Sequence, residues 1–321
     1  MHVLDDMKVV GQHDRQNKLD SLLEQPAGLL QPFVTSSLQP AQPITKVVSV
    51  CDGVWRVPAL LVETWPTLAV PYVVCDSDTL PRWLDETTLV IVMGNEVMSH
   101  AVQRQIQDKG VCFVAMTEVL LEVKPTSVFV AYRALLDVLL HYHLIDQRAI
   151  DTVTAAVQPL TRAAAAWAKE VPSADNLAKQ IALHMMGKTP IIYTGSQMAP
   201  VALYWKIECN LTARSTAWYG VHPRDSAYEH TGWTSHPVQK PFAVLDLVSS
   251  FESEAVTGWY TSAERTLSGQ RPQARTIEAQ GSTMFEHGAY LSLLGCFSMA
   301  YLALLYGHDP GKTSYKQRSV S

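Results

Sequence analysis

The chain has 321 residues, of which 47% are hydrophobic and 17% are charged, and its formal net charge is −5. This length and apolar content suffice for one large or two medium folded domains and exclude a disordered chain. Because the Lys and Arg residues are scattered through an acidic chain, nothing in the charge pattern favours nucleic-acid binding.

The cysteines are few, odd in number and widely spaced, without any CxxC pair. This usage predicts reduced thiols in a cytoplasmic protein and not a disulfide framework or a zinc site. The first 14 residues are polar, and the longest apolar run, near the C-terminus, is short for a membrane span. We therefore expect a soluble, cytoplasmic protein without a membrane partner. The cysteines are Cys51, Cys75, Cys112, Cys209 and Cys296.

The first half of the chain alternates short apolar runs with helical patterns. Residues 1–45 are polar or rich in proline, and we expect them to wrap the outside of the first domain. An amphipathic helix over 100–110 ends at a glycine, and a strand over 111–116 follows it. Parallel βαβ units explain this alternation. Three β-branched runs predict strands buried on both faces, at 46–52, 70–76 and 88–95.

Two long helices, over 127–145 and 149–171, come before a second series of strands and helices. The last helix extends to about residue 307. The sequence therefore predicts an α/β fold with mainly parallel sheets in two domains, which occupy residues 1–150 and 151–321. The strands of the second series are predicted at 189–195, 215–220, 242–250 and 274–281, with a helix over 253–268.

Three predicted strands end in turns whose backbone N–H groups could hold an anion. In open parallel sheets, ligands bind at the carboxyl ends of the strands, where loops lead into helix N-termini. The alternative is that these residues only turn the chain. The candidate binding residues are Gly53 after the first strand, Gly94, Asn95 and Ser99 after the third, and Ser196 at the start of the second half.

A carboxylate and two histidines follow in the second half. Glu208 lies in a predicted helix, and His222 and His230 come after it. A carboxylate and an imidazole can move a proton within a sugar, where the carboxylate takes it from carbon and the imidazole assists ring opening. The alternative is that Glu208 is an ordinary surface residue of its helix. No HExxH or similar spacing is present, so we expect no metal site.

The segment TPIIYTGSQMAPVALYWKIECNLTARSTAWYGVHPRDSAYEHTGW and the tail EAQGSTMFEHGAYLSLLGCFSMAYLALLYGHDP resemble the bifunctional phosphoglucose/phosphomannose isomerase family. This family belongs to the SIS (sugar isomerase) superfamily, and the resemblance covers roughly residues 45–310. It implies two three-layer αβα SIS domains and a homodimer. It also implies an aldose–ketose isomerase that converts glucose 6-phosphate or mannose 6-phosphate to fructose 6-phosphate without metal or cofactor.

The same resemblance assigns site residues. Glu208 takes the place of the base that moves a proton between C1 and C2. The family's ring-opening histidine falls on Ala227, so His230 is the candidate substitute acid. Lys316 lies near the family's C-terminal lysine, as does Lys312. Arg133 lies one position from its phosphate-contacting arginine.

The phosphate loops depart from the family pattern. Val-Cys-Asp-Gly-Val stands where a glycine-glycine-serine loop is expected, and Glu96 replaces a threonine, so a carboxylate would repel a phosphate there. Three functions stay open: an isomerase with a Glu208 base, an inactive SIS protein that binds a sugar derivative or regulates a partner, and a scaffold with a vestigial cleft. The aromatic residues Trp218, Tyr219 and Trp233 and the apolar helix 283–306 are candidate dimer-interface residues.

Overall fold

The computed structural model describes residues 3–33, 42–76, 80–116, 127–234 and 241–312, and for Ser226, Ala227 and His230 it describes the backbone only. The chain divides into two compact units. The sheet A unit comprises Gln25–Val157, and the sheet B unit comprises Met1–Glu24 and Gln158–Ser321.

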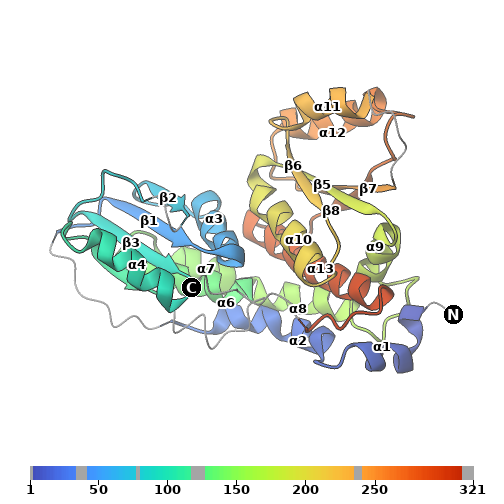
Figure 1. Ribbon diagram of the computed structural model, residues 1–321, viewed down its shortest axis with the longest axis horizontal. Coiled ribbons are helices and arrows are strands. Elements are labelled where there is room, and N and C mark those ends of the chain that lie inside the picture. Colours follow the sequence, from blue (N-terminus) through green and yellow to red (C-terminus); the bar gives the residue numbers. More distant parts are fainter. Residues whose placement is uncertain (1–2, 34–41, 77–79, 117–126, 235–240, 313–321) are drawn as a thin grey trace. The chain divides into compact units, whose positions relative to one another are not determined.

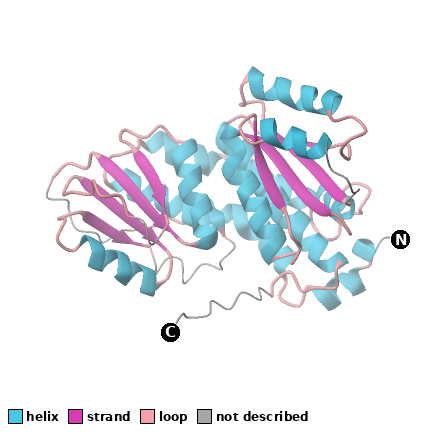
Figure 2. Cartoon of the chain, turned by 45° about the horizontal axis from the view of Figure 1, so that its top comes forward, coloured by secondary structure: helices cyan, strands magenta, loops and turns pink. Residues whose placement is uncertain are grey.

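Each unit is built on a parallel four-stranded sheet with flanking helices (Figure 2), which confirms the predicted α/β class. Sheet A has the strand order β2-β1-β3-β4, and sheet B has the order β6-β5-β7-β8. The strands of sheet A are β1 (Lys46–Cys51), β2 (Tyr72–Cys75), β3 (Thr88–Met93) and β4 (Cys112–Ala115). Those of sheet B are β5 (Thr189–Gly195), β6 (Trp218–His222), β7 (Phe242–Val248) and β8 (Arg275–Glu278).

In the sheet A unit, helix α4 covers one face of the sheet. The β-branched residues of β1 and β3 that point to this face pack with the apolar side of α4. The helices of this unit are α3 (Arg56–Thr64), α4 (Glu96–Ile106), α6 (Val128–His141) and α7 (Gln147–Ala155), with short 3₁₀ turns η2 (Gln25–Leu30) and η3 (Gly53–Trp55).

In the sheet B unit, helices lie on both faces of the sheet. In Figure 1, α11 and α12 lie on one face, and α9, α10 and α13 lie on the other. The helices are α1 (Met7–His13), α2 (Lys18–Glu24), α9 (Leu177–Met185), α10 (Ala199–Leu211), α11 (Ser226–Thr234), α12 (Glu254–Thr266) and α13 (Met284–Leu305), with 3₁₀ turns η1 (Val3–Asp5) and η4 (Ser196–Met198). Helix α8 (Val157–Ala166) begins at the boundary between the units.

Helix α13 is the core of the sheet B unit. It is the one described helix with the length and apolarity to cross a membrane, but 94% of its most apolar window is buried by the rest of the protein. Gly295 lets α10 approach closely, since a Cβ there would lie 2.5 Å from the ring nitrogen of Trp205. That nitrogen donates to the Leu291 carbonyl at 2.8 Å. An apolar surface on every side of the helix is therefore explained by burial within the unit.

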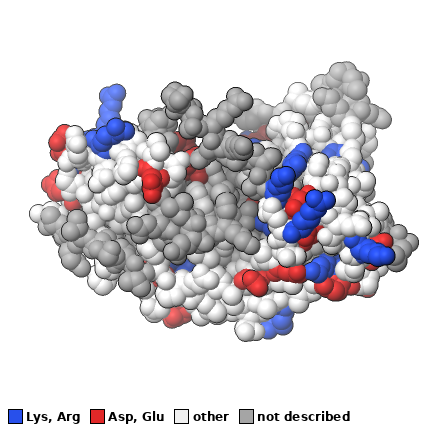
Figure 3. All heavy atoms as spheres, turned by 60° about the horizontal axis from the view of Figure 1, so that its bottom comes forward, with Lys and Arg blue, Asp and Glu red and all other residues white. Residues whose placement is uncertain are grey.

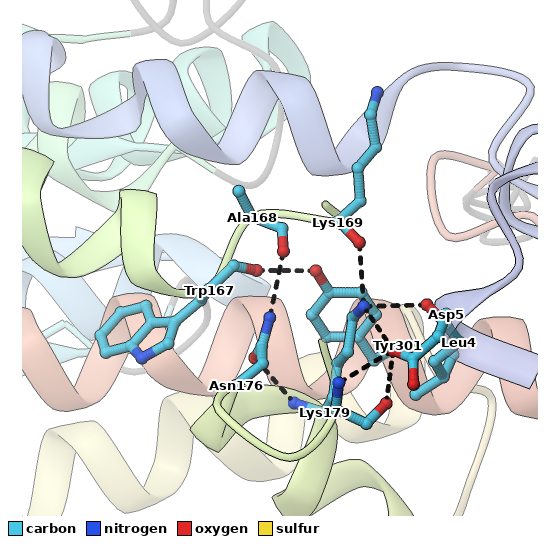
Figure 4. A network of polar contacts seen from close by, with 9 residues as sticks. Leu4, Asp5, Trp167, Ala168, Lys169, Asn176, Lys179 and Tyr301 are labelled. Carbon is cyan, nitrogen blue, oxygen red and sulfur yellow. Dashed lines mark hydrogen bonds and ion pairs between the residues drawn. The ribbon is translucent and has the colours of Figure 1, made fainter. Parts of the chain in front are cut away.

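Only part of the N-terminal segment lies in the unit where the sequence analysis placed it, since the sheet A unit begins at Gln25. Residues 1–45 were expected to wrap the first domain, but the first 24 belong to the sheet B unit. Figure 4 shows the contacts that hold them, with the ammonium group of Lys179 at the centre. Lys179 is 0% exposed and donates to the Leu4 carbonyl at 2.8 Å, to the Lys169 carbonyl at 2.9 Å and to Asp5 at 3.1 Å. A buried ammonium group needs such acceptors, and two of them come from η1.

The predicted helix over 149–171 is also wrong in its extent. The structure has α7 and α8 there, separated at Ala156. Pro159 explains the break, because it has no N–H to continue the α7 hydrogen-bond ladder but is tolerated in the first turn of a new helix.

Candidate functional site

The carboxyl end of sheet B brings together the turns after β5, β7 and β8. After β5, the chain enters η4 and then α10, so the N–H groups of Gln197 and Met198 lie at the N-terminal end of a helix. The carboxylate of Glu252, from the segment after β7, accepts from Met198 N at 3.1 Å and from Gln197 N at 3.4 Å. Burial raises the pKa of Glu252, and the two N–H donors oppose that rise. An internal carboxylate therefore occupies the position in which the sequence analysis expected Ser196 to help hold an anion.

A histidine lies at the same end of the sheet. His287, in the first turn of α13, has Ser249 Oγ at 2.9 Å from Nδ1 and the Gly281 carbonyl at 3.3 Å from Nε2. Because a carbonyl can only accept, Nε2 carries the proton in the neutral ring and Ser249 donates to Nδ1. Burial lowers the pKa of His287. This shift favours the neutral imidazole, and the Phe251 ring packs against it nearly at a right angle, with the ring centroids 4.8 Å apart.

Glu208, the predicted base, lies between α10 and α13. Its side chain is 0% exposed. Oε2 accepts from the Thr212 hydroxyl at 2.7 Å, one helical turn further on, while Oε1 has no hydrogen-bond partner among the described residues. Tyr204 and Cys296, which are close enough to interact electrostatically with Glu208, contact each other at 3.2 Å between Sγ and the hydroxyl oxygen. The carboxylate therefore lies in a helix–helix interface without access to solvent.

In the sheet A unit, the turn between β3 and α4 is closed by its own side chains. The Asn95 side chain accepts from Met98 N at 2.8 Å and so caps α4. A Cβ at Gly94 would lie 2.3 Å from the Met98 Cε, so the Met98 side chain fills the space in front of this glycine. Ser99 is buried in α4. Gly53 has φ +55, and a Cβ built there would meet no atom within 4 Å. The left-handed backbone conformation therefore explains why glycine occurs at this position.

Acidic residues predominate at this edge of sheet A. Asp52 follows β1, Asp76 follows β2 and Glu96 begins α4. Arg56 forms an ion pair with Asp76. This distribution disfavours a phosphate at the edge.

Arg133, the predicted phosphate ligand, is engaged within the sheet A unit. Its Nε donates to both oxygens of Asp137 at 2.9 and 3.0 Å, and its Nη1 donates to the Leu29 carbonyl at 2.7 Å. Asp137 in turn accepts from Phe33 N at 2.8 Å. The guanidinium group thus links α6 to η2 and the segment after it.

The remaining predicted residues lie partly or wholly outside the description. His230 is in α11, and its side chain is not described. Lys316 lies outside the described residues. His222, which stacks on Tyr193 with ring centroids 4.8 Å apart, is buried at the end of β6. Among the residues that are described, no group of three His, Cys, Asp or Glu side chains is placed to hold a metal ion.

The sequence analysis missed Glu252, His287 and a buried acid on β7. Asp246 lies beside Tyr193 of β5 in the sheet register, and burial raises its pKa to about 7, against the opposing effect of Arg271. Arg271 itself donates to Glu264 at 2.7 Å. An aspartate inside the apolar run FAVLDLV was a visible signal, because a charge in a buried strand needs an explanation. Glu252 had no such signal, since its partners are backbone groups 54 and 55 residues away.

The charged residues give no single-sign surface on the face drawn in Figure 3. Lys and Arg side chains lie beside Asp and Glu among the described atoms of this face. This mixture gives no electrostatic attraction for a polyanion there.

The family comparison concerns the second half of the chain. Residues 174–318 match the family described as the bacterial phospho-glucose isomerase C-terminal SIS domain. The bifunctional phosphoglucose/phosphomannose isomerase of Aquifex aeolicus (strain VF5) is 24% identical over 132 residues, which make up 41% of this chain and 41% of that protein. The matched region is therefore less than half of that relative.

Solved structures show the same fold over nearly the whole chain. A glucose-6-phosphate isomerase like protein from Thermus thermophilus has a TM-score of 0.67 and 19% identity, with 97% of this chain and 95% of that chain covered. The C-terminal domain of glucosamine-fructose-6-phosphate aminotransferase from Francisella tularensis has a TM-score of 0.65 and 9% identity, with 92% and 97% covered. At these identities the likeness concerns the fold alone.

Proposed function

We propose that the chain is a SIS protein that binds a carbohydrate derivative without isomerising it, because residues 174–318 match the bacterial phospho-glucose isomerase C-terminal SIS domain family. The observation that carries this proposal is the burial of Glu208, which is 0% exposed and bonded to Thr212 of its own helix.

A general base must come within hydrogen-bond reach of the proton that it takes from the substrate. Glu208 is enclosed by α10 and α13, so a sugar carbon cannot approach it unless these core helices separate. Helix α13 is almost entirely buried, and parting it from α10 would expose much of the core. The geometry thus favours a structural role for Glu208.

The phosphate ligands expected for an isomerase also have structural roles. Arg133 is paired with Asp137, and Asn95 caps α4. A substrate phosphate would have to displace these contacts before binding to either residue. Because both residues already have structural partners, we favour a protein that binds its ligand without turnover over a catalyst.

The second candidate is an aldose–ketose isomerase with Glu208 as base, His230 as acid and Lys316 as a further catalytic group. One observation favours it. The Oε1 atom of Glu208 has no partner among the described residues, and a buried carboxylate oxygen without a hydrogen bond is costly, so catalysis would explain its presence. Under this candidate the substrates are fructose 6-phosphate and glucose 6-phosphate or mannose 6-phosphate, and no cofactor takes part.

Two measurements on the full chain separate the candidates. The first follows glucose 6-phosphate and mannose 6-phosphate formation from fructose 6-phosphate for the wild type, Glu208→Gln and the exposed control Glu24→Gln. The second follows the melting temperature with sugars and sugar phosphates. No turnover together with a melting shift supports the binding protein. Turnover that Glu208→Gln abolishes and Glu24→Gln retains refutes it, and the absence of any sugar-induced shift favours the scaffold.

We also propose a cytoplasmic homodimer. The predicted interface helix 283–306 is buried within the sheet B unit, so it offers little surface to a partner. Trp218 and Tyr219 of the edge strand β6 are exposed and suit an interface, whereas the indole nitrogen of Trp233 donates to Tyr193 at 3.2 Å. Light scattering that reports the monomer mass would contradict the dimer.

A further inference from the structure

Arg271, in the turn after α12, interacts with two carboxylates on the face of sheet B that α11 and α12 cover (Figure 1). Its Nη2 donates to Oε1 of Glu264 in α12 at 2.7 Å. Asp246 of β7 is close enough for an electrostatic attraction to Arg271. Among the described ion pairs, however, Arg271 pairs with Glu264 and not with Asp246. One guanidinium group therefore has two possible carboxylate partners.

Asp246 and Arg271 each have a buried polar atom without a partner. Asp246 is 2% exposed, and its Oδ1 has no hydrogen-bond partner among the described residues. The Arg271 side chain is 3% exposed, and its Nε has no acceptor in the same part of the chain. A buried donor and a buried acceptor that stay unpaired each cost free energy. A hydrogen bond between these two groups would remove both costs.

Tyr193 of β5 lies beside both groups. It is the register neighbour of Asp246 across β5 and β7, so the two side chains point to the same face of the sheet. The guanidinium carbon of Arg271 lies 5.9 Å from the centroid of the Tyr193 ring. The carboxyl group of Asp246 and the guanidinium group of Arg271 are therefore neighbours of one aromatic side chain.

We infer that Asp246, Arg271 and Glu264 form a pH-sensitive switch, in which Arg271 donates to Glu264 while Asp246 is protonated and donates from Nε to Asp246 after that acid ionises. This inference goes beyond the proposed function and does not depend on it. The Glu264 side chain is 39% exposed, so water can stabilise its charge when Arg271 leaves, whereas buried Asp246 needs the guanidinium group. Burial raises the pKa of Asp246 to about 7, so the exchange of partners falls near neutral pH.

The exchange of partners changes the contacts at the end of α12. Oε1 of Glu264 also accepts from Ala274 N at 3.2 Å, and β8 begins at the next residue. Glu264 and Arg271 thus hold the turn between α12 and β8 together. When Arg271 pairs with Asp246, Glu264 is free to turn toward water. We therefore expect residues 264–275 to be less protected from hydrogen exchange above pH 7 than below it.

Other titratable groups also face this cluster. Histidine is the one side chain among them that ordinarily titrates near neutral pH, at about 6.5. A pH-dependent signal from this face could therefore come from His222, and the test needs a variant that removes the Asp246 titration and keeps His222. The other groups are Tyr193 of β5, Glu229 of α11, which is hydrogen-bonded to Tyr193, Tyr260 and Glu264 of α12, and Glu252 before α12.

The test follows the Nε–H signal of Arg271 in the full chain by proton–nitrogen NMR, from about pH 5 to about pH 9, with Arg271→Lys to assign it. In the wild type we expect the signal to move with a midpoint near pH 7, as Nε gains a carboxylate acceptor. Asp246→Asn should abolish this movement. Glu264→Gln should lower the midpoint by about 1 pH unit, because it removes a like charge and a competitor for Arg271. Glu254→Gln, which removes an exposed carboxylate of the same helix, should leave the midpoint unchanged.

A signal that stays fixed over this pH range overturns the inference. So does a signal that moves equally in Asp246→Asn, since His222 would then be the titrating group. Hydrogen exchange, corrected for the intrinsic rates, is the second measurement: protection of residues 264–275 should fall through neutral pH in the wild type and stay constant in Asp246→Asn. If Asp246→Asn does not fold, the midpoints of the other two variants decide, and equal midpoints for Glu264→Gln and Glu254→Gln refute the switch.

Discussion

Replacement of Lys179 by methionine tests the role of this residue in holding the N-terminal segment on the sheet B unit. Methionine keeps most of the length and apolar surface of the side chain and removes the ammonium group. In the structure that group donates to the Leu4 and Lys169 carbonyls and to Asp5, and it lies 5.5 Å from the centroid of the Tyr301 ring (Figure 4). The substitution therefore leaves three acceptors without this donor.

The expected cost follows from these contacts. A hydrogen bond to a charged group contributes about 1.5–3 kcal/mol, and removing one partner of a buried ion pair costs about 3–5 kcal/mol. Two effects make the net loss of unfolding free energy smaller than the sum of these costs. Burial, which lowers the pKa of Lys179, shows that the ammonium group is itself poorly solvated. Asp5 keeps the Ser173 N–H and hydroxyl as donors, both at 2.8 Å. We expect a loss of roughly 3 kcal/mol for the sheet B unit.

The assay is urea unfolding of the full chain, combined with hydrogen exchange resolved by peptide. Lys8→Met is the control, because Lys8 is an exposed lysine of α1 in the same unit. Exchange protection of residues 3–13 should fall in Lys179→Met and stay unchanged in Lys8→Met. If the two variants lose equal stability and keep equal protection, the ammonium group does not hold the segment and the reasoning is wrong.

Three further substitutions test other buried polar groups. Asp246→Asn should flatten the pH dependence of stability. The folded pKa of about 7 exceeds the unfolded value of about 3.9, so the protonated acid stabilises the fold fully below about pH 4 and loses this contribution, at most about 4 kcal/mol, as the pH rises to 7. Urea unfolding at several pH values measures this dependence, and parallel plots of stability against pH for the wild type and the variant would contradict the assignment. Arg133→Met should destabilise the sheet A unit by about 3 kcal/mol and leave sugar affinity, measured by calorimetry, unchanged. If Arg133 instead binds the phosphate of a ligand, the substitution should weaken sugar-phosphate affinity and leave stability nearly unchanged. Thr212→Val should cost about 1–3 kcal/mol in thermal unfolding, because Glu208 loses its hydroxyl donor; no loss would show that this bond is not structural.

The fold class and most of the helices and strands could be predicted from the amino-acid pattern. The β-branched runs at 46–52, 88–95 and 189–195 became β1, β3 and β5, because short apolar segments buried on both faces leave few alternatives to a parallel sheet. The motif resemblance in the second half is confirmed by the family match over residues 174–318. The short apolar runs and the motif were sufficient for these predictions, because both can be recognised from residues that are neighbours in the sequence.

The contacts of the polar side chains could not be predicted in this way, because they depend on how distant segments pack. Glu208 could be assigned to a helix from the sequence, but its burial against α13 depends on packing between segments about 90 residues apart. The same holds for two other groups. Glu252 contacts the β5–η4 turn and Lys179 contacts η1 through residues far away in the sequence, which no local spacing encodes. A carboxylate or an ammonium group has the same sequence signal whether it meets a ligand, water or the backbone, and the folded chain alone determines which of these surrounds it.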